Sequence, residues 1–274
     1  MAQQQFQFTR LQDGKKQRLD TLRQAIGMSS DRETWLFVSP HDDDLVIGAG
    51  LWILAAIQAG VDVQVIVVTD GRMGYCTPQQ RDNIADIRRA ETYESFQILG
   101  VGRDNIAYIG YPDGALYDLQ GRRKHRATDE VKPTQGYVGL CNEFVYHLRR
   151  TRPARVFVPT IADLHPDHQI TNNELMISLF HASGAIWPEL GEPLADVPAV
   201  YELAIYCDFP QPPQLEVRTD EATFDKKLAG IAAYRSQLQI AKLVENMRKA
   251  GAYEYLRELN FRFYSPNNHK SAFA

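Results

Sequence analysis

The sequence lacks the features that mark disulfide-bonded, membrane-spanning and secreted proteins. Its three cysteines, Cys76, Cys141 and Cys207, are far apart and include no CxxC pair, so they cannot form a disulfide framework. No segment approaches the roughly 20 apolar residues that a membrane-spanning helix needs. Residues 1–24 contain no long apolar stretch typical of a signal peptide. We therefore expect a cytoplasmic protein with no membrane span.

An excess of charge of one sign is also missing. The formal net charge is −4, so the chain lacks the strongly basic character of nucleic-acid-binding proteins, and we expect no nucleic-acid partner. Apolar residues make up 44% and charged residues 23% of the 274 residues, an ordinary globular composition. No repeat or linker interrupts the chain, so residues 1–274 are predicted to form one domain with a C-terminal extension packed on it.

The chain does contain a regular alternation of strands and helices. An N-terminal helix is predicted over 10–28, where apolar residues recur at helical spacing. Further apolar patterns predict strands at 34–40, 61–71, 105–110, 154–160 and 200–207, and helices at 45–59, 81–99, 137–150, 165–183 and 224–237. This order predicts an α/β fold whose mostly parallel sheet is covered by helices on both faces.

Unusual polar residues gather where these strands end. In such sheets, ligands bind outside the carboxyl ends of the strands. That rule selects residues 40–44, 70–76, 111–114 and 160–168 as the place to look for a functional site.

The first of these segments is Pro40-His41-Asp42-Asp43-Asp44. Adjacent carboxylates repel one another, and a divalent cation would offset that repulsion. The alternative interpretation is an Asp-rich turn that caps the following helix.

The second segment is Asp163-Leu164-His165-Pro166-Asp167-His168. Its two histidines are three positions apart and could share one site, or they could be exposed turn residues. Taken together, the two segments offer a His-Asp-His set with an open position, which suits a catalytic zinc ion. Spare carboxylates and a spare imidazole are left for proton transfer and for stabilising an oxyanion.

These motifs resemble those of the PIG-L/LmbE-like N-acetylglucosaminyl deacetylases, which carry His-x-Asp-Asp after the first strand and a late His-x-x-His in a Rossmann-like, three-layer domain. Supporting matches cover about residues 34–240: Thr69-Asp70-Gly71, Arg88-x-x-Glu91, Tyr111-Pro112-Asp113-Gly114, and Lys227 with Tyr234-Arg235-Ser236-Gln237.

The resemblance implies a role for individual residues. His41, Asp44 and His168 would bind the metal, and Asp43 would be the general base acting on the metal-activated water. His165 would stabilise the oxyanion or protonate the leaving amine. Two further residues would assist: Asp167 would orient a histidine, and Asp113 would bind a sugar hydroxyl.

The sequence departs from the family pattern at three positions. Asp42 stands where the family usually has Pro, and Leu45 where it has Glu. Because of Asp42, the working acidic pair could be Asp42 and Asp43, although the spacing from His41 favours Asp43 and Asp44. Many members carry Glu where this chain has Arg72, which could bind an anionic group of the substrate.

Three weaker signals favour structural interpretations. The basic run 122–126 is expected to be a solvated surface. Arg88 and Glu91 are expected to pair with each other on one helix face. Tyr234 and Gln237 are expected to pack the late helix on the sheet.

The resemblance implies a zinc-dependent hydrolase that removes an N-acetyl group from a small amino sugar or glycoside. A glycosyltransferase that uses Asp42-x-Asp44, or a non-catalytic sugar-binding module, are the alternatives. Iron, manganese or cobalt would also suit the ligand set. The sequence leaves open the exact substrate, the acyl group and the pathway, and it allows a homo-oligomer.

Overall fold

The computed structural model describes residues 5–30 and 32–273. Residues 1–4, part of the segment for which no signal peptide was expected, lie outside this range. The strands are β1 (Phe6–Gln12), β2 (Lys15–Leu19), β3 (Thr34–Ser39), β4 (Asp62–Thr69), β5 (Ile106–Tyr111), β6 (Arg123–Lys124), β7 (Tyr137–Val138), β8 (Arg155–Pro159), β9 (Ala199–Leu203), β10 (Leu215–Thr219) and β11 (Tyr253–Leu259). The helices are α1 (Leu22–Ile26), α2 (Asp44–Gln58), α3 (Ile84–Leu99), α4 (Leu140–Thr151), α5 (Pro166–Ser183), α6 (Glu221–Ala232) and α7 (Ile240–Ala250).

A single sheet in the order β2-β1-β10-β11-β9-β8-β3-β4-β5 runs through the described chain. Strands β5, β4, β3, β8 and β9 are parallel to one another. Strands β11, β10, β1 and β2 extend this sheet in antiparallel pairs, and β6 and β7 form a separate two-stranded antiparallel sheet. The predicted α/β class with a mostly parallel central sheet is confirmed.

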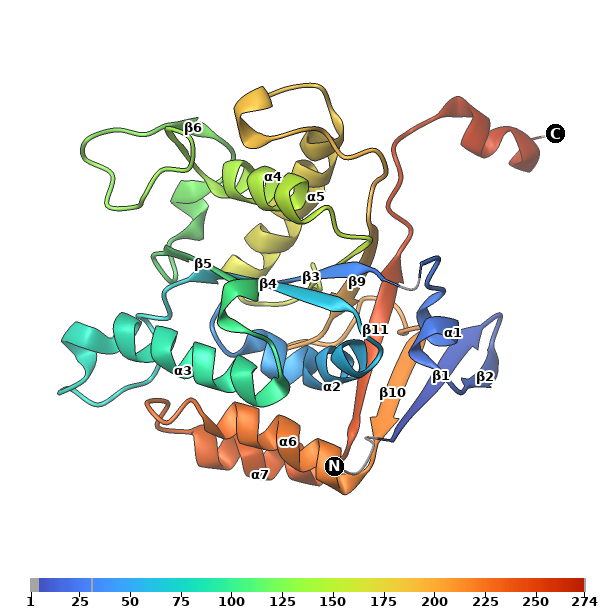
Figure 1. Ribbon diagram of the computed structural model, residues 1–274, viewed down its shortest axis with the longest axis horizontal. Helices are drawn as coiled ribbons and strands as arrows, with labels where there is room; N and C mark the ends of the chain where they lie inside the picture. The colour runs from blue at the N-terminus through green and yellow to red at the C-terminus, as the bar shows by residue number, and fades with distance from the viewer. Residues whose placement is uncertain (1–4, 31, 274) are drawn as a thin grey trace.

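Helices cover both faces of the sheet, as predicted. Helices α4 and α5 lie on one face, and α2, α3, α6 and α7 lie on the other (Figure 1). Strand β3 shows how the sequence produces the two cores. Its alternate residues Trp35 and Phe37 pack into the core beneath α2, whereas Leu36 and Val38 pack into the core beneath α4 and α5.

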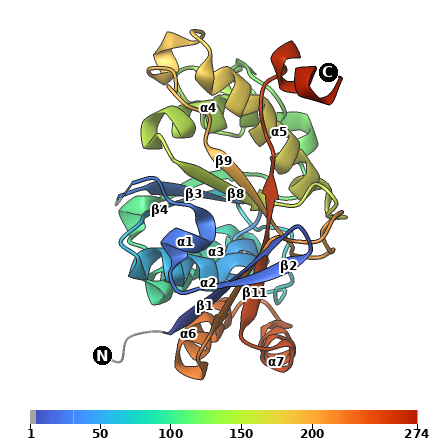
Figure 2. The ribbon, with the colours of Figure 1, turned by 90° about the vertical axis from the view of Figure 1, so that its right-hand side faces the viewer.

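The predicted helix at residues 10–28 is wrong. Strands β1 and β2 form a hairpin there, with Gln12 opposite Lys15, and only the short helix α1 follows (Figure 2). The two loop residues, Asp13 and Gly14, have φ values of 51° and 73°. Positive φ at both positions is typical of the type I′ turn that Asp-Gly favours.

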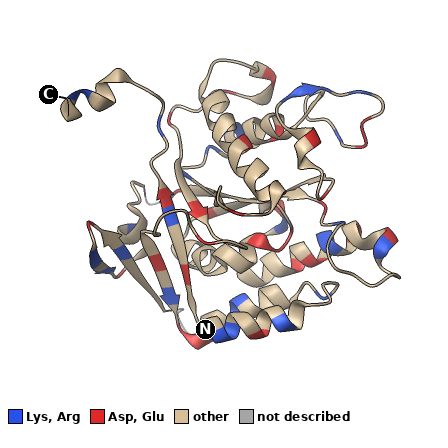
Figure 3. Cartoon of the chain, turned by 180° about the vertical axis from the view of Figure 1, so that it is seen from behind, with Lys and Arg blue, Asp and Glu red and all other residues tan. Residues whose placement is uncertain are grey.

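Positively and negatively charged residues are interspersed along the antiparallel strands and on helices α6 and α7 (Figure 3). Among residues 5–30 and 32–273, no helix is both long enough and apolar enough to cross a membrane. After β11, the chain leaves the sheet and ends on the side of α5 (Figure 2).

Candidate active site and metal centre

The candidate site lies beyond the carboxyl ends of the parallel strands. Residues 40–44 follow β3, and residues 160–168 follow β8, which pairs with β3 directly. The segments after β4 and β5 complete the same edge. The topology thus brings together all four segments that the sequence pattern selected.

Three ligand atoms converge at this edge. His41 Nδ1 lies 3.2 Å from Asp44 Oδ2 and 3.1 Å from His168 Nε2. The distance from His168 Nε2 to Asp44 Oδ2 is also 3.1 Å. All three side chains are buried. The structure therefore brings the three predicted ligands together, although His168 is 127 positions from His41 in the sequence.

This triangle fits a small divalent cation. Ligand atoms about 2.0–2.1 Å from a tetrahedral zinc ion lie about 3.3 Å from one another, close to the separations above. Asp44 Oδ1 is buried and has no hydrogen-bond partner among the described residues. Buried polar atoms nearly always have a partner, so this orphan atom favours a bound ion.

Two looser groups of potential ligands share His41. One adds His165 and His168, and the other adds Asp113 and Asp167, with ligand atoms within 4.8 Å of one another. The second group meets His41 at Nε2, because Asp113 Oδ1 lies 3.2 Å and Asp167 Oδ2 lies 3.4 Å from that nitrogen. We favour the tighter triangle at Nδ1, which leaves both carboxylates to accept the Nε2 proton.

Each histidine of the triangle thus has a carboxylate at its other ring nitrogen. For His168, that carboxylate is Asp163, whose Oδ2 lies 3.2 Å from Nδ1. Metal-binding histidines commonly have such a partner, which fixes the ring and the tautomer. Asp163 had no predicted role, although it stands inside the second motif.

The carboxylates make the centre strongly favourable for positive charge. Burial acts to lower the pKa of His168, but the charge of Asp44 and hydrogen bonds raise it to about 9. Burial also acts to lower the pKa of His41. Asp44, Asp113 and Asp167 outweigh this effect and hold the pKa of His41 well above its usual value. The field that favours protonated imidazoles would equally favour a bound cation.

Asp43 lies beside the triangle and has a separate environment. Its Oδ2 accepts a hydrogen bond of 2.5 Å from Gln237 Nε2. Burial, followed by the charge of Asp44, raises the pKa of Asp43. A carboxylate with a raised pKa is a better proton acceptor near neutral pH, which suits a general base.

His165 is held so that it can act as a hydrogen-bond donor. It is the N-cap residue of α5, and its Nδ1 accepts a 3.2 Å hydrogen bond from the backbone N–H of Asp167. Burial and the nearby rings of His41 and His168 lower the pKa of His165. The neutral ring must then carry its proton on Nε2.

The carboxylate of Asp42 pairs with a residue outside the triangle, and the choice of Asp43 and Asp44 as the working acidic pair stays a prediction. Its Oδ2 lies 3.2 Å from Nη1 of the buried Arg88. A Cβ at Gly71, which has φ +67°, would lie 2.8 Å from Asp42 Oδ1, so only glycine fits there. The expectation that Arg88 pairs with Glu91 is wrong, because Glu91 instead accepts hydrogen bonds from Ser236.

Two residues from the late helical region also reach this loop. Tyr234 donates a 2.5 Å hydrogen bond to the carbonyl oxygen of Asp42, and Gln237 donates to Asp43. Both follow the end of α6. Their expected role, packing a helix on the sheet, is therefore incomplete, since both hold the acidic loop.

The two predicted substrate-binding residues lie at the rim. Arg72 Nε and Nη2 lie 2.7 and 2.6 Å from Asp70 Oδ2, and the Arg72 side chain is 47% exposed. Asp113 Oδ2 accepts a hydrogen bond from the backbone N–H of Met73, while its Oδ1 faces His41. The substrate roles of both residues stay predictions.

The basic run is only partly the solvated surface that was expected. Arg122 stacks on the ring of Tyr137, with its guanidinium carbon 3.4 Å from the ring centre, and forms an ion pair with Glu189. Arg123 forms an ion pair with Asp129. These contacts tie the loop to its surroundings.

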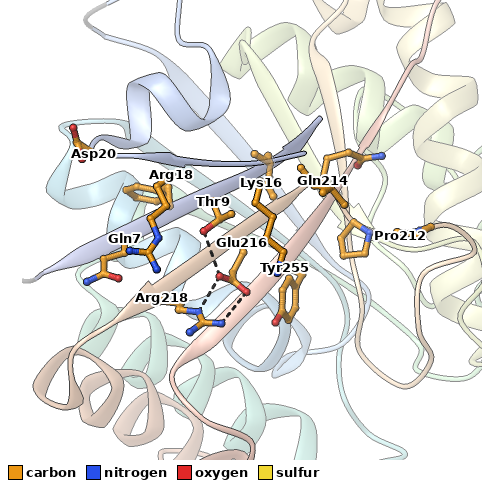
Figure 4. Close-up of a pocket in the computed structure, with 14 residues that line it drawn as sticks. Gln7, Thr9, Lys16, Arg18, Asp20, Pro212, Gln214, Glu216, Arg218 and Tyr255 are labelled. Carbon is orange, nitrogen blue, oxygen red and sulfur yellow. Dashed lines mark hydrogen bonds and ion pairs between the residues drawn. The ribbon is translucent and has the colours of Figure 1, made fainter. Parts of the chain in front are cut away.

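Two cavities need to be distinguished. One of about 310 Å³ is lined by Asp43, Tyr206 and residues of α7, so it adjoins the site. A larger one of about 650 Å³ lies on the antiparallel strands, where Thr9 and Arg218 bond to Glu216 (Figure 4). The lining of the larger cavity includes none of the site residues. We therefore take the smaller cavity, which Asp43 lines, as the functional one.

Comparisons with known proteins agree with this geometry. Diacetylchitobiose deacetylase from Thermococcus kodakarensis is 29% identical over 51% of this chain and 46% of its own length. The 1D-myo-inositol 2-acetamido-2-deoxy-alpha-D-glucopyranoside deacetylase from Kineococcus radiotolerans is 27% identical over 54% of this chain and 45% of its own. The matched region thus spans less than half the length of these curated relatives.

Solved structures share the fold over most of the chain. The conserved protein TT1542 from Thermus thermophilus is 27% identical and covers 85% of this chain and 98% of its own, with a TM-score of 0.63. N,N'-diacetylchitobiose deacetylase from Pyrococcus horikoshii is 24% identical over 83% and 84%, with a TM-score of 0.64. GalB, the 4-carboxy-2-hydroxymuconate hydratase from Pseudomonas putida, is 18% identical over 85% and 98%, with a TM-score of 0.63. A hydratase and a deacetylase share this fold, so the fold alone does not determine the reaction.

The family itself is established by the sequence. The profile described as PIG-L, GlcNAc-PI de-N-acetylase, matches residues 36–178, slightly more than half of the chain. That range begins in β3 and ends in α5, so it includes both motifs that carried the resemblance. The chain belongs to the PIG-L deacetylase family.

Proposed function

We propose that the chain is a zinc-dependent hydrolase that removes the N-acetyl group from an amino sugar in a small glycoside. The observation that carries this proposal is the triangle of His41 Nδ1, Asp44 Oδ2 and His168 Nε2, with the carboxylate of Asp43 beside it. The names of the relatives, a diacetylchitobiose deacetylase and a deacetylase of an inositol glycoside, support an N-acetylglucosamine-containing substrate.

His41, Asp44 and His168 would hold the ion. A divalent cation bound there polarises the amide carbonyl and lowers the pKa of a water molecule. Two histidines and one carboxylate leave a coordination position open, as catalytic zinc sites do, although iron, manganese or cobalt would also fit.

The remaining residues move protons. Asp43 accepts a proton from the attacking water as that oxygen bonds to the carbonyl carbon. His165 donates a hydrogen bond through Nε2 to the developing oxyanion, and the proton that Asp43 accepted from water passes to the amide nitrogen as the C–N bond breaks. Acetate and the free amine leave. Asp113, Asp163 and Asp167 hold the two metal-binding rings in place, and Arg72 and Asp113 line the side where the sugar would bind.

The two alternatives fit the geometry less well. A glycosyltransferase would need Asp42 and Asp44 to share one ion, but Asp42 bonds to Arg88 whereas Asp44 bonds to the histidines. A non-catalytic module would have no need for a further buried carboxylate, that of Asp43, held by Gln237 beside the three ligands. The cytoplasmic location, the absence of a nucleic-acid partner, the single domain and a homo-oligomer stay predictions.

The test uses purified, zinc-loaded protein with N-acetylglucosamine, its methyl glycoside and diacetylchitobiose, with release of amine and acetate measured together. We expect Asp43→Asn to lower kcat by about 10²- to 10⁴-fold, as loss of a general base does, while zinc content by elemental analysis stays at the wild-type level. Asp44→Ala should lose both activity and zinc. The exposed Asp86→Asn is the matched control and should keep both.

Two outcomes would contradict the proposal. One is equal release by Asp43→Asn and the wild type. The other is a zinc-loaded wild type that releases neither product from any of the three compounds, which would direct attention to hydration or to ligand binding without turnover.

A further inference from the structure

A cavity of about 310 Å³ opens next to the candidate base and is larger than an acetyl group needs. Small-molecule pockets typically measure about 300–1,000 Å³. The acetyl group of the proposed reaction adds a single methyl group beyond the carbonyl carbon. The cavity can therefore hold a substantial further part of a substrate.

The cavity is continuous with the candidate site through Asp43 and Tyr206, both of which line it. The ring of Tyr206 lies 5.2 Å from the ring of His168, centre to centre, and its backbone N–H donates a 3.2 Å hydrogen bond to Asp163. Tyr206 is 62% exposed, so its ring forms an open wall between the metal ligands and the cavity.

By area the walls of the cavity are mainly apolar, although Gln237, Gln239 and Asn246 add polar groups to the lining. Ile47 of α2, Ile205 in the segment after β9, and Leu243 of α7 contribute aliphatic side chains. The charged residue of α7 at the cavity, Lys242, is 63% exposed and its ammonium lies 3.0 Å from Glu245. A ligand group that fills this cavity would be uncharged and largely aliphatic.

The position of the cavity relative to His41 indicates which end of the substrate it would take. Asp113 and Asp167 lie at Nε2 of His41, and polar groups there suit a sugar. His168 lies at Nδ1, and its ring packs against Tyr206, which lines the cavity. An amide whose sugar lies on the Asp113 side would direct its acyl group toward the cavity.

Helix α7 contributes one wall of the cavity through Lys242, Leu243 and Asn246. Helix α7 lies beyond the matched residues 36–178 and packs beside α6 (Figure 1). Within the described chain, α7 contributes no fully buried residue, but Leu243 is among the partly buried side chains that pack this helix against the core.

We infer that this cavity is an acyl-chain pocket, with Leu243 and Ile205 as specificity-determining residues, and that the preferred substrate is an N-acyl amino sugar whose acyl chain is longer than acetyl. The inference rests on the proposed hydrolysis and deepens it by naming the class of acyl group. The reaction itself is unchanged: water adds to the carbonyl carbon, the C–N bond breaks, and a fatty carboxylate and an amine leave.

The experiment measures kcat/KM of the zinc-loaded protein for N-acetyl-, N-butanoyl- and N-hexanoylglucosamine. Burial of each methylene corresponds to about a fourfold gain, so butanoyl, with two more methylenes, should exceed acetyl by about 15-fold. Leu243→Trp should abolish this gain. Asn246 is exposed and lines the same cavity. Asn246→Trp is therefore a second test of the gain, in a variant that should fold even if Leu243→Trp does not. Leu238→Trp, 65% exposed and outside the lining, is the control and should keep the gain.

The possible outcomes distinguish failure of the acyl-chain pocket from failure of the proposed hydrolysis. Hydrolysis of the acetyl compound without any gain from longer chains would overturn the acyl pocket and leave the proposed function intact. In alkyl glycosides of N-acetylglucosamine, the alkyl chain is on the aglycone instead of the acyl group. If kcat/KM rises with the length of that chain, and Leu243→Trp loses the rise, the cavity binds the aglycone and the acyl assignment is overturned. If no compound is hydrolysed, the proposed function fails, and calorimetric titration still tests the pocket: the hexanoyl compound should bind at least tenfold more tightly than the acetyl compound, and equal affinities would overturn the inference.

Discussion

Asp43 stands next to a predicted metal ligand in the sequence, but the side chain that holds its carboxylate comes from Gln237, 194 positions further along. This hydrogen bond fixes one oxygen of the candidate base. A hydrogen bond to a charged group contributes about 1.5–3 kcal/mol, so its removal should be visible in the rate.

We expect Gln237→Ala to lower kcat by at least about tenfold, because the carboxylate of Asp43 loses its fixed position. Steady-state kinetics with zinc content measured in parallel would check this. The exposed Gln97→Ala should behave as wild type. A Gln237→Ala enzyme with kcat within twofold of wild type would show that Gln237 is not needed to position the base.

Some residues of the site belong to local sequence motifs, whereas others come from distant parts of the chain. His41, Asp43 and Asp44 form one local motif, and His165, Asp167 and His168 form another, so the chemistry of each motif could be read directly. Long-range partners leave no such pattern.

Three contacts of this kind were not predictable. Tyr206 approaches His168 after β9, Gln237 reaches Asp43, and Arg88 bonds to Asp42 instead of its helical neighbour Glu91. Each depends on how separate elements pack, which no spacing along one segment encodes.

Helix α2 begins with Asp44 and is fixed near its middle by a buried ion pair from two other elements. Lys227 Nζ lies 2.6 Å from Glu254 Oε1 and donates to the carbonyl oxygen of Ile47. Glu254 accepts the backbone N–H of Leu51 at 3.0 Å. A Cβ at Gly50 would lie 2.9 Å from Lys227 Cγ, so glycine is needed for this close approach.

Removing one partner of this pair should destabilise the protein. We expect Lys227→Met or Glu254→Ala to lower the free energy of unfolding by about 3–5 kcal/mol, because a buried charge is left unpaired. The double variant Lys227→Met/Glu254→Leu should be less destabilised than the sum of the single changes.

Urea denaturation followed by circular dichroism would measure these differences. The control is the exposed pair Lys242–Glu245, where Glu245→Ala should leave the unfolding free energy nearly unchanged. Single variants as stable as wild type would show that the pair does not hold α2.

The N-terminal hairpin shows why one element was mispredicted. Leu19, Leu22 and Ile26 recur at helical spacing, but Leu19 ends β2 while the other two lie on α1. The Asp13-Gly14 turn was the stronger signal, because both residues adopt the positive φ that a two-residue hairpin loop requires.

At the scale of the whole molecule, the parallel half of the sheet was predictable and the antiparallel half was not. Strands β3, β4 and β8 are continuous apolar runs, as strands buried on both faces must be. Strands β10 and β11 instead alternate apolar with charged residues, and their pairing with β1 and β9 joins the two ends of the chain. Such pairing between distant segments carries no local sequence signal.

The three proposed metal ligands come from two segments of the chain, with His41 and His168 127 positions apart, so only the folded chain can assemble the complete site. A ligand that binds only the folded state stabilises it by about 2.7 kcal/mol when its free concentration is a hundredfold above Kd. For a chain of this size, one kcal/mol shifts Tm by about 2–4 °C. We therefore expect zinc to raise the Tm of chelator-stripped protein by about 5–10 °C in differential scanning calorimetry.

Asp44→Ala should show no such shift, whereas Asp86→Asn should respond as wild type does. An equal rise in Asp44→Ala would mean that zinc binds elsewhere on the chain, and it would remove the physical basis for the triangle as the metal centre.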